Sequence, residues 1–140
     1  PRAWQGKPLF RLELRPRGLQ AWPQAKAVPL SCLKGTRVAA LSGLGNPGRF
    51  EASLGALGAQ VLPWRFADHH PFSLAELSTP PPGAQYIVCT RKDAQRLPLG
   101  ATPALPLYIL DAEANVSPAA PFNTLLRRAL QRRSTRGNHV

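Results

Sequence analysis

The residues Val38–Phe50, which read VAALSGLGNPGRF, constrain the fold more than any other stretch of the chain. A short apolar run at Val38–Leu41 predicts a buried strand, and the glycines after it predict a tight turn. Asn46 and Pro47 then favour a helix start, because an asparagine oxygen can cap a helix and proline needs no N–H at the first position. A strand that enters a helix through a glycine turn presents backbone N–H groups that suit an anion such as phosphate.

Three further segments extend this pattern into a small sheet. Gln60–Phe66 predicts an edge or bent strand, because Pro63 cannot donate a backbone hydrogen bond. Tyr86–Thr90 is an apolar run typical of a strand buried on both faces, and Leu107–Leu110 predicts a last short strand. Strands that alternate with helices indicate the α/β class, with a small, mostly parallel sheet and flanking helices.

Helices are predicted between these strands. Apolar residues at helical spacing run over Phe50–Leu57, and Gly58 suits the C-terminal cap. Ser73 and Glu76 form an S-x-x-E capping box over a short helix. Residues 91–97 predict a turn or a single helical turn.

The beginning of the chain predicts a two-stranded linker. Leu9–Leu14 alternates apolar and charged residues like a half-buried strand, and Gly18–Trp22 suits a hairpin partner across Arg15–Arg17. We therefore expect a linker or β-hairpin region over residues 1–35 and an α/β lobe over residues 36–140. Because the sequence has no methionine, we expect it to be a piece of a longer protein.

The charge of the chain favours anionic partners. Eighteen Lys and Arg residues against seven Asp and Glu give a net charge of +11, which suits nucleic acid, nucleotide phosphates or an acidic membrane surface. A genome rich in G and C is the alternative cause, since Arg, Ala, Pro, Gly and Leu are all abundant. Phe122–Arg133 predicts a helix with arginines largely off its apolar face, either a solvated face or a contact with anionic lipid or nucleic acid.

The cysteines and the apolar runs bear on the compartment. Cys32 and Cys89 lie far apart and form no CxxC, so we expect a reduced, cytosolic environment. No run approaches the roughly 18 apolar residues of a membrane span.

Polar residues gather where three predicted parallel strands end, and ligands of such sheets bind beyond these carboxyl ends. Asp68 and His69 are candidates for acid–base chemistry or for orienting a phosphate. The alternative is a structural turn in which Asp68 caps the chain and one histidine packs. No second ligand group accompanies them, so no metal site is predicted. The candidate substrate-binding residues are Gly43, Gly45, Asn46, Thr90, Lys92 and Asp93.

The loop Gly43–Gly48 also matches the dinucleotide-binding pattern G-x-G-x-x-G, and Asp68 follows about 20 residues later. Against this function, Pro47 removes an N–H from the loop, and a dinucleotide-binding domain needs a larger sheet. A turn in which glycine supplies the backbone angles is the structural alternative. The sequence contains neither a P-loop motif nor G-x-S-x-G.

Taken together and in this order, Val38–Phe50, Phe66–Phe72 (FADHHPF) and Thr90–Leu97 (TRKDAQRL) resemble the C-terminal part of tetraacyldisaccharide 4'-kinase, the lipid A pathway kinase. The resemblance covers about residues 30–110. It implies the smaller α/β lobe of a P-loop-type kinase, joined by a two-stranded linker to an N-terminal domain outside this sequence. The implied activity is transfer of the γ-phosphate of ATP to the 4' hydroxyl of tetraacyldisaccharide 1-phosphate, which gives lipid IV-A.

The resemblance also implies cofactors, partners and roles. ATP and Mg²⁺ would be held mainly by the absent domain, and His69, with Asp68 beside it, would support a catalytic aspartate of that domain. The partners would be the lipid A disaccharide precursor and the anionic inner-membrane surface, at its cytoplasmic face, with peripheral or N-terminal anchoring. We expect a monomer that does not bind nucleic acid. We also expect that this chain alone has no kinase activity. Arg91 departs from the family, which usually carries an acid there, and Gly48 stands where a larger residue is usual.

Two rival functions stay open on the residues alone. One is a small α/β dinucleotide- or nucleic-acid-binding module that uses Gly43–Gly48 and the arginine-rich C-terminus. The other is a purely structural lobe that packs on a partner, in which Asp68 and His69 would have no chemical role.

Overall fold

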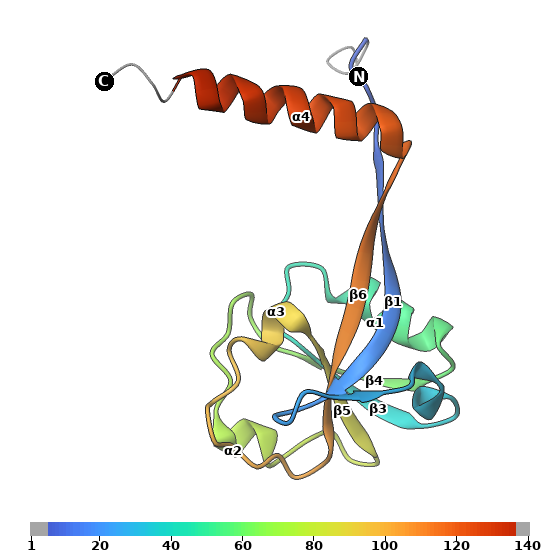
Figure 1. Cartoon of the computed structure of the whole chain (residues 1–140). Coiled ribbons are helices and arrows are strands. Elements are labelled where there is room, and N and C mark those ends of the chain that lie inside the picture. Colours follow the sequence, from blue (N-terminus) through green and yellow to red (C-terminus); the bar gives the residue numbers. More distant parts are fainter. Residues whose placement is uncertain (1–5, 137–140) are drawn as a thin grey trace. The chain divides into compact units, whose positions relative to one another are not determined.

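The computed structural model describes residues 6–136, with side chains to residue 132. These residues form a six-stranded sheet with the order β2-β1-β6-β5-β3-β4 (Figure 1). The strands are β1 (Arg11–Ala21), β2 (Lys26–Val28), β3 (Arg37–Ser42), β4 (Gln60–Arg65), β5 (Tyr86–Thr90) and β6 (Leu107–Ser117). The helices are η2 (Leu30–Leu33, a 3-10 helix), α1 (Pro47–Ala56), α2 (Leu74–Leu77), α3 (Arg91–Ala94) and α4 (Ala119–Arg136).

The chain divides into two compact units. Unit 1 combines the residues up to Arg15 with those from Glu113 onward, and unit 2 is Pro16–Ala112. The boundary expected after residue 35 does not coincide with this division. Unit 1 combines residues from both ends of the chain. The expected division assumed that each part is one continuous stretch of sequence.

Unit 2 is built around β3 and β5, which are buried on both faces. The two strands run parallel, with Val38 opposite Tyr86 and Ala40 opposite Val88. Successive side chains of a strand point to opposite faces of the sheet, so β3 contributes to two separate cores. The α/β class with a mostly parallel sheet is confirmed, since β3 pairs in parallel with β4 and β5, and β5 with β6.

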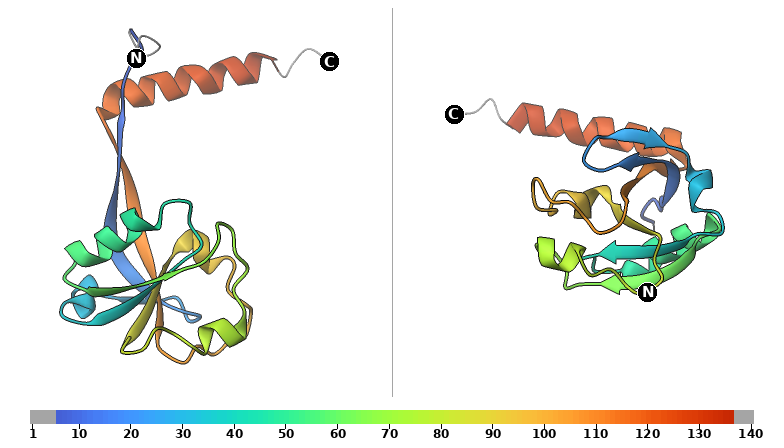
Figure 2. Two further views of the ribbon diagram at one scale, coloured as in Figure 1. Left: turned by 180° about the vertical axis from the view of Figure 1, so that it is seen from behind. Right: turned by 90° about the horizontal axis from the view of Figure 1, so that it is seen from below.

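The two cores lie on opposite faces of the sheet. On one face, Phe50 and Leu54 of α1 pack with Val38 and Ala40. On the other, Ala39 and Leu41 pack with residues that follow β4 and β5, including Leu77 of α2. Accordingly, α1 lies behind the strands in Figure 1 and in front of them in the left view of Figure 2, whereas α3 does the opposite.

Most local expectations of unit 2 are confirmed. Ser73 and Glu76 form the capping box of α2, and Pro47 occupies the first turn of α1. Asn46 stands at the N-cap of α1, but its side chain makes no capping hydrogen bond, contrary to expectation. β4 is an edge strand, as Pro63 predicted.

The hairpin expected between Leu9–Leu14 and Gly18–Trp22 is wrong. The supposed turn at Arg15–Arg17 lies inside the single strand β1, whose hairpin partner is β2, with Leu19 opposite Val28. β2 pairs with β1 only at its last three residues. A proline is tolerated at position 16, where one edge of β1 has no described partner strand.

The last strand and the last helix are longer than predicted. β6 continues past the expected end at Leu110 to Ser117, since β1 and β6 are neighbours in the sheet. The C-terminal helix predicted over Phe122–Arg133 is confirmed as α4 and begins earlier, at Ala119. The side chains of Arg133 and Arg136 lie outside the described residues.

Candidate functional site at the strand ends

Asp93 organises the edge of unit 2 at which β3, β4 and β5 end. Its side chain is fully buried. One carboxylate oxygen, Oδ1, accepts a hydrogen bond of 3.2 Å from the Gly43 N–H, and Oδ2 accepts one of 3.1 Å from the Thr90 hydroxyl. The Thr90 oxygen in turn accepts from the Asp93 N–H and caps α3. The loops after β3 and β5 are thereby joined through one carboxylate.

Arg96 neutralises this buried charge and adds the loop after β4. One guanidinium nitrogen, Nη2, donates to Asp93 Oδ1 and, over 3.1 Å, to the Gly43 carbonyl. The other, Nη1, lies 3.2 Å from Nδ1 of His69. The Arg96 guanidinium also lies 5.8 Å from the centroid of the Phe72 ring. All three predicted loops therefore meet at one arginine, which the sequence argument had not singled out.

His69 combines an exposed ring with a constrained backbone. Its side chain is 67% exposed, and its φ of 60° lies in the left-handed region that non-glycine residues adopt infrequently. Its N–H donates to the Gly43 carbonyl over 3.0 Å. Asp68 Oδ2 lies 3.6 Å from His69 Nε2, beyond hydrogen-bond distance. Backbone strain of this kind is concentrated at functional sites.

His70 has a structural environment instead. Its ring stacks on Phe66 with 4.8 Å between centroids, and Nε2 lies 2.9 Å from Oε1 of Glu76. The Ser73 backbone N–H, and then His70, hold the pKa of Glu76 below its usual range. Of the two adjacent histidines, one is packed and the other faces solvent.

The remaining candidates take less part in this arrangement. Gly45 lies near Asp68, because a Cβ added there would come 3.7 Å from Asp68 Oδ2. Asn46 and Lys92 are exposed, and none of the hydrogen bonds described at this edge involves their side chains. The structure thus brings together Gly43, His69, Thr90 and Asp93, with Asp68 beside them.

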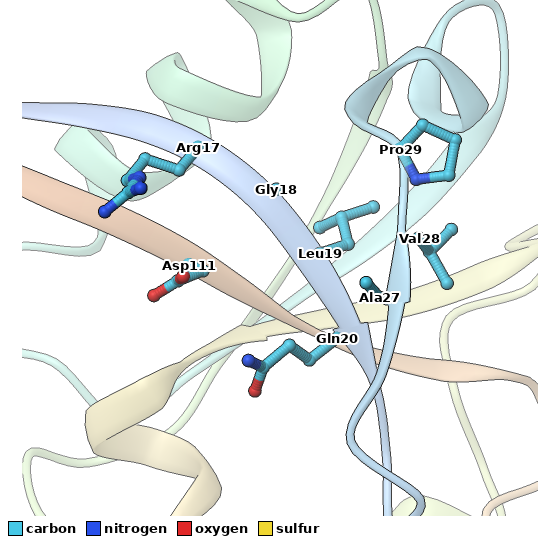
Figure 3. A pocket seen from close by; sticks show the side chains of 8 residues that line it. All are labelled: Arg17, Gly18, Leu19, Gln20, Ala27, Val28, Pro29 and Asp111. Atoms are coloured by element: carbon cyan, nitrogen blue, oxygen red, sulfur yellow. The ribbon is translucent and has the colours of Figure 1, made fainter.

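Arg91, which stands where the resemblance implies an acid, forms an ion pair of its own. Its guanidinium donates to Asp111 over 3.0 Å and reaches Gln20 over 3.4 Å. Asp111 and Gln20 line a cavity of about 490 Å³ along β1, β2 and β6, and Arg17 also contributes to its wall (Figure 3). The cavity contains none of the predicted site residues. Gln20, Arg91 and Asp111 are far apart in the sequence, so no local pattern predicts that they meet.

A profile of the family "Tetraacyldisaccharide-1-P 4'-kinase" matches residues 1–131. The chain belongs to this kinase family. The match spans all three loops of the site.

Individual relatives agree with this assignment. A tetraacyldisaccharide 4'-kinase of Alkalilimnicola ehrlichii is 38% identical over 76% of this chain and 29% of the relative. That of Aromatoleum aromaticum is 36% identical over 64% of this chain and 26% of the relative. The chain thus spans under a third of the length of these kinases.

A solved structure of the family has the same fold. A crystal structure of LpxK from Aquifex aeolicus, described as an "apo" form in complex with ATP, matches with a TM-score of 0.56 and 28% identity. The match covers 89% of this chain and 37% of that one. The lobe described here is therefore a part of the kinase architecture.

We predict that Gly43→Ala destabilises the chain whereas Gly45→Ala does not. A Cβ at Gly43 would lie 3.0 Å from the Ala67 carbonyl oxygen and 3.1 Å from Arg96 Nη2, which costs about 1–3 kcal/mol in packed surroundings. At Gly45 the added atom fits, and the change should stay below about 1 kcal/mol. Equilibrium urea unfolding measures both, and equal losses would contradict the close approach at Gly43.

Proposed function

We propose that the chain is the C-terminal lobe of a tetraacyldisaccharide 4'-kinase. The reaction is transfer of the γ-phosphate of ATP to the 4' hydroxyl of tetraacyldisaccharide 1-phosphate, which gives lipid IV-A. The observation that carries the proposal is the exposed His69, with Asp68 beside it, on an edge whose three loops are joined by Asp93 and Arg96. The family profile and the names of the relatives support it.

We infer that the site for ATP and Mg²⁺ lies mainly outside this chain. No group of three or more His, Cys, Asp or Glu residues that could hold a metal occurs within residues 6–136, and the sequence has no P-loop motif. The LpxK of the solved relative is in complex with ATP. In this proposal ATP and Mg²⁺ are bound mainly by the part of the kinase that lies outside this chain.

The part of this chain in the reaction is to position groups. Phosphoryl transfer depends on alignment and on stabilisation of charge rather than on covalent chemistry by the protein. His69 would hydrogen-bond and orient a catalytic aspartate of the nucleotide-binding part, and the Gly43–Asn46 loop would face the phosphorylated disaccharide. The dinucleotide-binding alternative is not favoured, because the Gly43 N–H is already bound by Asp93.

The first test compares this chain with a kinase of the relatives' length that contains it. We expect ATP-dependent phosphorylation of tetraacyldisaccharide 1-phosphate by the longer protein and none by the 140-residue chain. Thin-layer chromatography of the product from γ-³²P-labelled ATP measures both. Turnover by the chain alone, or its lack in the longer protein, would contradict the proposal.

In the longer protein, we predict that His69→Ala lowers kcat by roughly 100-fold, the size of a positioned proton-transfer or orienting contribution. The affinity for ATP should stay within about twofold, since nucleotide binding lies elsewhere; isothermal titration measures it. Gln95→Ala, an exposed neighbour on the same edge, is the matched control and should leave kcat unchanged. Normal turnover of the His69 variant would remove this residue from the site.

We further propose that the kinase acts as a monomer at the cytoplasmic face of the inner membrane, with α4 against the anionic lipid surface. Support comes from α4 itself, on which Leu125, Leu126 and Leu130 are about half exposed and Arg127 and Arg128 are exposed. None of the described helices has the length and apolar content to cross a bilayer. Basic residues contribute about 1 kcal/mol each at such a surface.

For this contact, we predict that Arg127→Glu with Arg128→Glu lowers binding to vesicles of 70% phosphatidylcholine and 30% phosphatidylglycerol by at least roughly tenfold. Co-sedimentation at low salt measures the bound fraction, which should also fall as salt is added. The control, Lys26→Glu with Arg49→Glu, makes the same change in net charge at exposed positions of unit 2. Equal loss in both variants would show that only net charge matters.

A further inference from the structure

The contact between Arg96 and His69 restricts the protonation of the imidazole. Nη1 of Arg96 lies 3.2 Å from Nδ1 of His69, and a guanidinium has hydrogen-bond donors but no acceptor. Nδ1 must therefore be the acceptor and carry a lone pair. A neutral imidazole that accepts at Nδ1 carries its proton on Nε2.

We propose that Arg96 is a positioning residue that holds His69 in the Nε2–H tautomer and directs this N–H away from the lobe. The other ring nitrogen, Nε2, lies 3.6 Å from Asp68 Oδ2, in a side chain that is largely exposed. That separation is too long for a hydrogen bond, so the Nε2–H can donate to an incoming carboxylate. The effect on turnover rests on the proposed function, whereas the tautomer does not.

The two nitrogens of the guanidinium fork have separate tasks. Nη2 is committed to Asp93 and the Gly43 carbonyl, which leaves Nη1 for His69. The Arg96 side chain is only 17% exposed, so this orientation is fixed by packing. Lysine has one nitrogen and cannot span both sets of acceptors. Arg96→Lys should therefore keep the bond to the buried carboxylate and lose the contact with His69.

The backbone fixes the other end of the contact. His69 keeps its left-handed φ of 60°, and its N–H donates to the same Gly43 carbonyl that Arg96 Nη2 binds. One carbonyl oxygen thus binds both the His69 backbone and the Arg96 guanidinium. Such a doubly held arrangement favours one ring orientation over the alternatives.

The first arm of the test uses the 140-residue chain with ¹⁵N-labelled histidine. Long-range ¹H–¹⁵N spectra, recorded where the imidazoles are neutral, distinguish protonated from unprotonated ring nitrogens, and a His69→Gln variant assigns the signals among the three histidines. We expect one Nε2–H tautomer for His69 in the wild type and a mixture in Arg96→Lys. An Nδ1–H form in the wild type, or identical spectra in both, would overturn the proposal. If Arg96→Lys does not fold, the wild-type spectrum alone decides.

The second arm is a double-mutant cycle in the longer kinase. Arg96→Lys should lower kcat about tenfold, equivalent to about 1.4 kcal/mol, with KM for ATP unchanged. It should have no further effect when His69 is already alanine. Arg65→Lys is the control, because Arg65 pairs with Glu51 elsewhere in the lobe. An equal loss in both backgrounds would overturn a role through His69, and an inactive longer kinase would count against the proposed function while the spectra still test Arg96.

Discussion

The buried carboxylate of Asp93 is the interaction on which the arrangement of this lobe depends. An ion removed from water costs several kcal/mol unless it is paired and hydrogen-bonded. Here the Gly43 N–H, the Thr90 hydroxyl and the Arg96 guanidinium satisfy it. Because the Gly43 N–H comes from the loop after β3 and the other two partners follow β5, a movement of either loop would cost the buried carboxylate a hydrogen bond. The exposed edge that carries His69 is thereby held by an interaction inside the protein.

Local signals sufficed for much of unit 2, since the features concerned involve neighbouring residues. The capping box of Ser73 and Glu76 and the proline at the start of α1 act within one turn, and both are confirmed. The hairpin across Arg15–Arg17 failed because strand pairing is not local. An extended strand and a hairpin have similar alternation, and only the neighbouring β6, distant in sequence, decides between them.

The position of the candidate site could be predicted from the topology, but the side-chain contacts within it could not. Parallel strands place their ends at one edge, so the three loops could be grouped before any contact was known. Asp93 and Arg96 are three residues apart, a spacing at which side chains of a helical turn meet, and this was the available signal for Arg96. Which histidine of the adjacent pair packs could not be inferred, because it depends on the aromatic ring of Phe66 and on Glu76.

The residues at this edge limit the part that the chain can take in the proposed phosphoryl transfer. Transfer of a phosphoryl group needs metal ions and cationic groups that neutralise charge as it develops, and the described residues form no metal site. What they provide is an imidazole in a constrained backbone position, beside an arginine that is itself fixed by a buried carboxylate. Under the proposed function, the exposed nitrogen of this imidazole would orient an acidic group of the rest of the kinase. The buried carboxylate of Asp93 therefore sets the geometry of this edge, and under the proposed function the rest of the kinase would supply the reacting groups.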